Sequence, residues 1–127
     1  MAAVALVGLV VANGTALAWR ATWWATAGRT SRAALTELDA QVARVPADAE
    51  VWVVGLPDHL RHAYIFRNAF PSVGAVRGYR QTVHAVLDDE LPPGARAAQL
   101  AEFRARPRAV VLSYAGGRIV RGSDPAR

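Results

Sequence analysis

Three side chains that bind metals or move protons lie close together in the sequence, at Asp58, His59 and His62. If the segment is helical, His59 and His62 share one face, because residues three apart lie on the same side of a helix. With Asp58 beside them, they could bind a metal ion or provide a general base. The segment lacks the glutamate and the i, i+4 histidine spacing of a zincin helix. We favour the alternative, a helix-capping aspartate followed by two partly exposed histidines, and we predict no metal and no cofactor.

Four arginines lie in or after this segment, at Arg61, Arg67, Arg77 and Arg80. Guanidinium groups bind phosphate groups through paired hydrogen bonds, and basic side chains beside a membrane attract anionic lipid headgroups. The four could therefore line a phosphate-binding or headgroup-binding surface. The ordinary alternative is that scattered arginines solvate a surface. The polar cluster that we single out consists of Asp58, His59, Arg61, His62 and Arg67.

The other chemistry-bearing residues give weaker signals. His84 lies in an alternating apolar stretch, where a half-buried, hydrogen-bonded histidine is the common case. Residues 88–90 (Asp-Asp-Glu) could bind a divalent cation, but they lack the spacing of a calcium loop and fit a solvated acidic turn. Ser113 is not in a Gly-x-Ser-x-Gly elbow, and no phosphate loop is present. We name no catalytic residue and expect that this chain alone is not an enzyme.

Composition excludes several classes of protein. The chain has 127 residues, of which 15 are basic and 10 acidic, for a formal net charge of +5. This length suits one compact domain at most, and the absence of cysteine excludes a disulfide framework and thiol chemistry. The basic residues, all arginine, are spread along the chain without the clustering and interleaved aromatics of nucleic-acid-binding domains. We therefore expect no nucleic-acid partner.

The N-terminal segment has the properties of a membrane helix. Residues 1–19 contain no charged side chain, and as a helix they would span roughly 28 Å, close to the hydrocarbon thickness of a bilayer. Trp19, Trp23 and Trp24 beside Arg20 are typical of the lipid–water interface, where an arginine can also place its charged group. We predict a transmembrane helix with an interfacial tryptophan belt over residues 1–28, and the lipid bilayer as the first partner.

Two alternatives remain open for this segment. Ala16-Leu17-Ala18 fits a signal-peptide cleavage site, which would release a small secreted domain, although no basic residue precedes the apolar run. The second alternative is the buried helix of a soluble protein, and in a domain of this size such a helix is seldom apolar on every side. If the helix spans a membrane, Gly8 and Ala12 form one small-x-x-x-small pair that could contact another membrane helix.

The charges around the segment bear on its orientation. Arg20, Arg29 and Arg32 follow the apolar run and no basic residue precedes it, so the positive-inside rule places the soluble part in the cytoplasm. This inference changes if the chain is the C-terminal part of a longer polytopic protein, because earlier helices would then set the orientation.

The remainder of the chain predicts a small domain. Residues 29–45 predict an amphipathic connecting helix from their apolar spacing, which Thr30 or Ser31 would cap if Gly28 breaks the preceding helix. Residues 46–121 form the domain, and residues 122–127 a frayed tail. The spacing and composition predict strands at 50–55, 82–86, 108–114 and 118–121, the last two as a hairpin, and helices at 59–70 and 95–106. The predicted fold class is α+β: an N-terminal transmembrane helix, then a small domain with short strands and a C-terminal β-hairpin.

Three stretches together resemble the C-terminal extracytoplasmic part of bacterial multi-spanning membrane proteins: 51–58 (VWVVGLPD), 63–70 (AYIFRNAF) and 108–120 (RAVVLSYAGGRIV). Some of those proteins look like glycosyltransferases of the GT-C, protein-mannosyltransferase-like kind. There, a last membrane helix precedes a strand running into Leu-Pro-Asp, a Tyr-x-Phe-Arg-Asn-like helix start and a closing hairpin. The resemblance implies an extracytoplasmic domain. It carries over no catalytic residue, because the catalytic acidic residues of such enzymes lie in an early loop between membrane helices.

These observations lead to a functional expectation. We expect a membrane-anchored accessory or interaction domain with a single span in this chain, the C-terminal part of a polytopic membrane protein, with an extracytoplasmic soluble part. Its partners would be the bilayer and other membrane helices or cell-envelope components. The alternative is the non-catalytic tail of a GT-C-type membrane glycosyltransferase whose catalytic part lies outside this chain.

Overall fold

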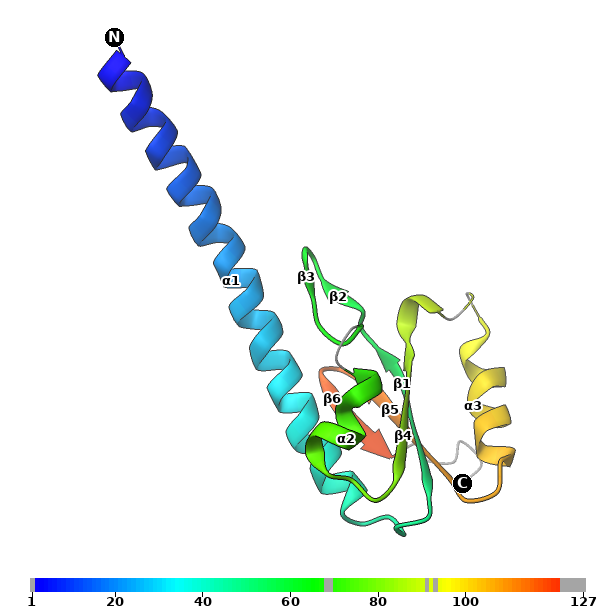
Figure 1. The fold of residues 1–127 in the computed structure, drawn as a ribbon. Coiled ribbons are helices and arrows are strands. Elements are labelled where there is room, and N and C mark those ends of the chain that lie inside the picture. The colour runs from blue at the N-terminus through cyan, green and yellow to red at the C-terminus, as the bar shows by residue number, and fades with distance from the viewer. Residues whose placement is uncertain (1, 68–69, 91, 93, 122–127) are drawn as a thin grey trace.

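A long helix joined to a small strand-rich domain makes up the computed structural model, which describes residues 2–67, 70–90, 92 and 94–121 (Figure 1). The long helix, the mixed α and β content and the C-terminal antiparallel hairpin confirm the predicted fold class. The predicted tail, 122–127, lies outside the described residues. The elements in chain order are α1 (Ala2–Val42), β1 (Glu50–Leu56), β2 (His59–Leu60), β3 (Ala63–Tyr64), the 3-10 helix η1 (Phe70–Ser72), α2 (Val73–Arg77), β4 (Thr82–Leu87), the 3-10 helix η2 (Asp88–Glu90), α3 (Arg96–Ala105), β5 (Ala109–Ala115) and β6 (Arg118–Arg121).

The helix α1 continues through the predicted membrane segment and the predicted connecting helix without a break. Gly28 lies within it, and a single mid-helix glycine costs only about 1 kcal/mol relative to alanine, so the helix does not end there. Thr30 and Ser31 are therefore helix-interior residues, and the predicted cap at this position is wrong. The helix is long and apolar enough to cross a membrane, and its most apolar stretch is not buried in the domain. Figure 1 shows this half of α1 projecting away from the sheet.

The four-stranded sheet has the order β4-β1-β5-β6. The central strand β1 pairs in parallel with both β4 and β5, and β6 closes one edge antiparallel to β5. The predicted strands at these positions are confirmed, whereas their parallel pairing was not predicted. Parallel strands are normally covered on both faces and read as continuous apolar runs. This accounts for the almost unbroken apolar sequence of β1, where Val51, Val53 and Val54 are fully buried.

Helices cover both faces of the sheet. On one face, Leu38 of α1 is fully buried with Val53 of β1, Leu112 of β5 and residues of η1 and α2. On the other face, Phe103 of α3 packs against a separate apolar cluster. Trp52 belongs to this second cluster, and its ring stacks at 4.2 Å on both His84 and Phe103. Because both faces are occupied by helices, the ends of the strands are where the domain can expose a site.

Polar contacts fix the second half of α1 to the domain. Glu37 accepts a hydrogen bond of 2.5 Å from the Ile119 backbone N–H at strand β6. Two residues further along, Asp39 accepts hydrogen bonds from the Tyr79 hydroxyl and from Arg77. Burial, together with the hydrogen bond to Asp39, raises the pKa of Tyr79 to about 12. The phenol therefore keeps its proton, and this hydrogen bond, throughout the physiological pH range.

The segment after β1 is not the helix predicted at 59–70. It forms the short antiparallel hairpin β2–β3, followed by η1. The Ile65 backbone N–H donates to the Asp58 backbone carbonyl at 2.9 Å, which closes the base of the hairpin. Arg61, at the turn, has a positive φ of 54°, so the chain reverses where helical spacing suggested that it would continue. The helix predicted at 95–106 is confirmed as α3, which ends before Pro107.

Candidate functional site

The candidate site lies at the carboxyl edge of the parallel strands. Because β1 and β4 run in the same direction, the residues after each strand meet at one edge of the sheet. Asp58 comes just after β1, and Asp89 lies in η2, directly after β4. In open α/β sheets, ligands bind outside the carboxyl ends of the strands. The parallel pairing thus brings together two acidic residues that are far apart in the sequence.

A pocket of about 490 Å³ occupies this edge. All five residues of the predicted polar cluster line it, and Tyr64 and Asp89 complete the lining. The other two arginines of the predicted phosphate-binding surface are not part of its lining. Arg77 forms an ion pair with Asp39 of α1 at 2.5 Å, and Arg80 lies just before β4, at the opposite edge of the sheet. The structure therefore narrows four candidate arginines to Arg61 and Arg67.

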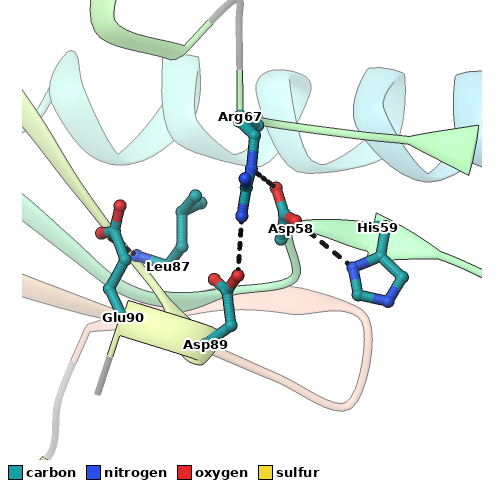
Figure 2. Close-up of polar contacts among 6 residues, drawn as sticks. All are labelled: Asp58, His59, Arg67, Leu87, Asp89 and Glu90. Atoms are coloured by element: carbon teal, nitrogen blue, oxygen red, sulfur yellow. Dashed lines mark hydrogen bonds and ion pairs between the residues drawn. The ribbon is translucent and has the colours of Figure 1, made fainter.

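Arg67 bridges the two acidic residues, as Figure 2 shows. Its Nε donates to Asp58 Oδ1 at 2.6 Å, and its Nη2 donates to Asp89 Oδ2 at 2.8 Å. The second Asp58 oxygen lies 3.3 Å from His59 Nδ1. Since an ionised carboxylate only accepts hydrogen bonds, Nδ1 carries the proton in this contact. The side chain of Asp58 is only 5% exposed, so its charge depends on these partners.

Arg67 controls the ionisation of Asp58. Its guanidinium holds the pKa of the Asp58 carboxyl below its usual range, more strongly than burial raises it, and His59 adds to the effect. A carboxyl with a lowered pKa stabilises the fold at neutral pH, and this stabilisation is lost as the pH falls through the lowered value. We predict that Arg67→Gln moves the Asp58 pKa upward, toward or above the ordinary value of about 3.9.

This prediction is checked by NMR titration of the Asp58 side-chain carboxyl carbon in the full chain. Arg80→Gln, which removes the same charge outside the pocket, should leave that titration unchanged. If the Asp58 carboxyl titrates identically in the parent and in Arg67→Gln, the ion pair does not exist in solution.

An arginine side chain occupies the crevice between β1 and β5. A Cβ atom on Gly55 would lie 2.1 Å from Nη2 of Arg96, and that atom donates to the Tyr114 backbone carbonyl at 3.1 Å. Gly55 also has a positive φ of 83°, which favours glycine. The close approach of Arg96 therefore depends on the missing side chain at Gly55. The described pocket lies elsewhere on this edge, between the end of β1, the η2 turn and the β2–β3 hairpin.

The tip of the β2–β3 hairpin touches the predicted membrane-interface stretch of α1. The guanidinium carbon of Arg61 lies 4.3 Å from the centre of the Trp23 ring. The His62 ring is 6.3 Å from the Trp19 ring, which itself packs edge-on against Trp23 at 6.0 Å. Figure 1 shows the hairpin rising from the sheet beside α1. The pocket is therefore joined directly to the tryptophan belt.

The rest of the predicted belt lies on the surface of α1. Trp24 is 55% exposed, and Arg20 is exposed and has no ion pair within the described part of the chain. Two members of the belt thus contact the hairpin, and two remain free to contact lipid.

The described residues contain no group of three or more histidine, aspartate or glutamate side chains placed to hold a metal ion. His59 and His62 lie on a hairpin and not on one face of a helix, so the geometry behind the metal hypothesis is wrong. The carboxylates of the acidic turn at residues 88–90 contact basic side chains and a backbone N–H of the protein. Asp89 pairs with Arg67, Asp88 lies 3.5 Å from Arg96, and Glu90 accepts the Leu87 backbone N–H at 3.2 Å. These carboxylates therefore contact two arginines and a backbone N–H.

Comparison with known proteins identified no relative. No protein-family model matches the chain, and neither a curated protein nor a solved structure matches it.

Proposed function

We propose that this chain is a membrane-anchored accessory or interaction domain, the C-terminal part of a polytopic membrane protein, with a binding pocket at the membrane surface. The observation that carries the proposal is the contact of Arg61 with Trp23 and of His62 with Trp19. Through this contact, the helix that enters the membrane also forms a support for the pocket. The pocket thereby has a fixed position relative to the bilayer.

Helix geometry supports a position of the pocket at headgroup level. A bilayer is about 40–45 Å thick, of which about 30 Å is hydrocarbon, so each polar layer is about 5–8 Å deep. From Trp19 to Trp23, a helix rises about 6 Å, and tryptophan is enriched at this level. If Trp19 lies at the boundary of the hydrocarbon, the residues that contact Trp19 and Trp23 lie within the polar layer. Arg61 and His62 are those residues.

The pocket is better suited to binding than to catalysis. Its most buried charge, Asp58, is committed to Arg67 and His59, and Asp89 is committed to the same arginine. A general base must be free to take a proton, whereas these contacts keep Asp58 ionised and held in place.

We propose an extracytoplasmic position for the domain, in agreement with the resemblance to multi-spanning membrane proteins and against the positive-inside rule.

A specific observation favours the second candidate, the non-catalytic tail of a GT-C-type membrane glycosyltransferase. Two of the stretches that carry the resemblance meet in the pocket. Asp58 ends the Leu-Pro-Asp stretch, Arg67 lies in the Tyr-Ile-Phe-Arg stretch, and their side chains form the 2.6 Å ion pair. In this case the domain would support catalytic groups that lie in other parts of the enzyme.

Membrane extraction and thiol labelling test the proposal, because the chain has no cysteine of its own. With the protein expressed from its own gene, Ala101→Cys places a thiol on the exposed surface of α3. We expect retention in the membrane after carbonate treatment, and labelling of intact cells by a membrane-impermeant maleimide. As a matched control, Val10→Cys within the span should not be labelled, because lipid shields it.

Each alternative predicts a different result. Labelling of Ala101→Cys only after lysis would show a cytoplasmic domain and would contradict the proposed side. Release of the protein by carbonate would show that α1 does not span the bilayer and would overturn the proposal.

A further inference from the structure

We infer that the pocket binds the phosphodiester group of an anionic lipid headgroup from the bilayer in which α1 is anchored. The inference rests on the proposed function, because it requires the pocket to lie at the membrane surface. It adds the chemical class of the ligand.

Arg61 is the residue best placed to receive this ligand. It lines the pocket at the hairpin tip, and within the described ranges it forms no ion pair with a carboxylate. Its contact with the Trp23 ring orients the guanidinium group but does not neutralise its charge. Its positive φ is unusual for a residue with a side chain. Such backbone conformations recur at ligand-binding sites, and at Arg61 the conformation also forms the turn of the hairpin.

The other lining residues suit a phosphate group. A guanidinium has five N–H donors, and the contacts with Asp58 and Asp89 use two of those of Arg67. Tyr64, His59 and His62 add further hydrogen-bonding groups around the pocket. Phosphate oxygens are strong acceptors and pair well with arginine. The two arginines and the Tyr64 hydroxyl thus supply donors to the pocket, whereas the Nδ1 proton of His59 is directed at Asp58.

The charges of the pocket lining suit a ligand with one negative charge better than a ligand with two. The charges of Asp58 and Asp89 offset those of Arg61 and Arg67, and both carboxylates are held by Arg67. Arg61 is left as the one arginine of this lining without a carboxylate partner among the described residues. A phosphodiester carries one negative charge, whereas a phosphomonoester carries about 1.5 to 2 at neutral pH. The second charge would be repelled by the two nearby carboxylates.

Because α1 would hold the pocket at the membrane surface, a weak affinity for the headgroup would be enough to keep the pocket occupied. A tethered site meets its ligand at an effective concentration set by the tether and not by the bulk solution. Because Arg61 and His62 contact the belt residues of α1, lipid headgroups surround the pocket mouth at all times. A shallow, solvent-facing pocket would bind the same group poorly from solution.

NMR titration of the full chain in neutral maltoside micelles tests the inference. The probe is dihexanoyl phosphatidylglycerol, and the readout is the backbone amide shifts of residues 59–64. Glycerophosphoglycerol, the same phosphodiester without acyl chains, separates a lipid source from a soluble one. We expect saturable shifts with the lipid and binding at least about tenfold weaker with the soluble compound.

Three variants locate the binding to Arg61. Arg61→Asn removes the charge but keeps a residue that tolerates a positive φ, and it should weaken lipid binding by about tenfold or more. Arg61→Lys keeps the charge but loses the planar guanidinium that stacks on Trp23, so it should bind more weakly than the parent and more tightly than Arg61→Asn. Arg80→Asn removes the same charge at the other edge of the sheet and should bind like the parent. Because lysine has the same steric cost at a positive φ as arginine, tighter binding by Arg61→Lys than by Arg61→Asn shows that the charge contributes to binding.

The contradicting outcomes are distinct. Equal weakening by Arg61→Asn and Arg80→Asn overturns the assignment to Arg61, and binding by Arg61→Lys no tighter than by Arg61→Asn overturns recognition of the ligand through charge. Equal affinity for glycerophosphoglycerol overturns the lipid source. Absence of shifts at residues 59–64 in a protein that resists carbonate extraction overturns this inference alone, whereas release by carbonate overturns the proposed function as well.

Discussion

Leu38→Ala is expected to lower the free energy of unfolding of the domain by about 2–5 kcal/mol. Leu38 lies on α1 and is fully buried, in one core cluster with Val53 of β1 and Leu112 of β5. Truncation would remove its apolar contacts and leave a cavity between the helix and the sheet, because a packed core relaxes only partly. The second half of α1 is therefore part of the domain core as well as the continuation of the apolar first half.

Leu17→Ala is the matched control on the same helix. Leu17 is 66% exposed and lies in the apolar stretch of α1, so its truncation should leave the domain stability within about 0.5 kcal/mol of the parent. The measurement is amide hydrogen exchange of β1 in lipid nanodiscs, which reports unfolding of the sheet and not of the apolar half of α1. Equal exchange rates in Leu38→Ala and in the parent would show that the sheet folds without α1.

Elements that depend on local sequence could be predicted. The apolar run of β1, the amphipathic α3 ended by Pro107, and the Gly-Gly turn of the β5–β6 hairpin each have signals within a few residues, and all are confirmed. The hairpin β2–β3 was missed because its apolar residues fit helical spacing equally well. Its turn also uses Arg61 at a positive φ in place of the usual glycine or asparagine.

Elements that depend on distant residues could not be predicted. Glu50 pairs with Thr82 on one side and with Ala109 on the other, and no local pattern specifies these partners. The same holds for the site. Five of its residues lie within a short stretch and were found by adjacency, whereas Asp89 reaches Arg67 only through the parallel pairing of β1 with β4. An acidic run directly after a predicted strand is the signal that could have pointed to it.

Phe103→Ala is expected to cost about 3–5 kcal/mol of stability, concentrated on the face of the sheet that α3 covers. Phe103 is the one buried side chain of α3 within the described residues, and it stacks on Trp52 at 4.2 Å. Arg106 lies over both rings, at 4.8 Å from Trp52 and 5.3 Å from Phe103. Removal of the phenyl ring breaks this stack, so α3 should exchange its amide hydrogens much faster than β1 does. Phe103→Leu keeps most of the apolar volume and should cost less than about 1.5 kcal/mol.

Phe103→Ala also tests whether the two parts of the carboxyl edge, the Arg96 contact and the pocket, are independent. Arg96 begins α3, so loss of α3 packing should free its guanidinium from Gly55 and the Tyr114 carbonyl. The pocket lining comes from the β2–β3 hairpin, Arg67 and η2, and none of it belongs to α3. At a temperature where β1 is still protected from exchange, Phe103→Ala should therefore bind dihexanoyl phosphatidylglycerol like the parent. Loss of lipid binding together with the protection of α3 would show that α3 holds the pocket in shape. The site would then extend along the whole carboxyl edge of the sheet.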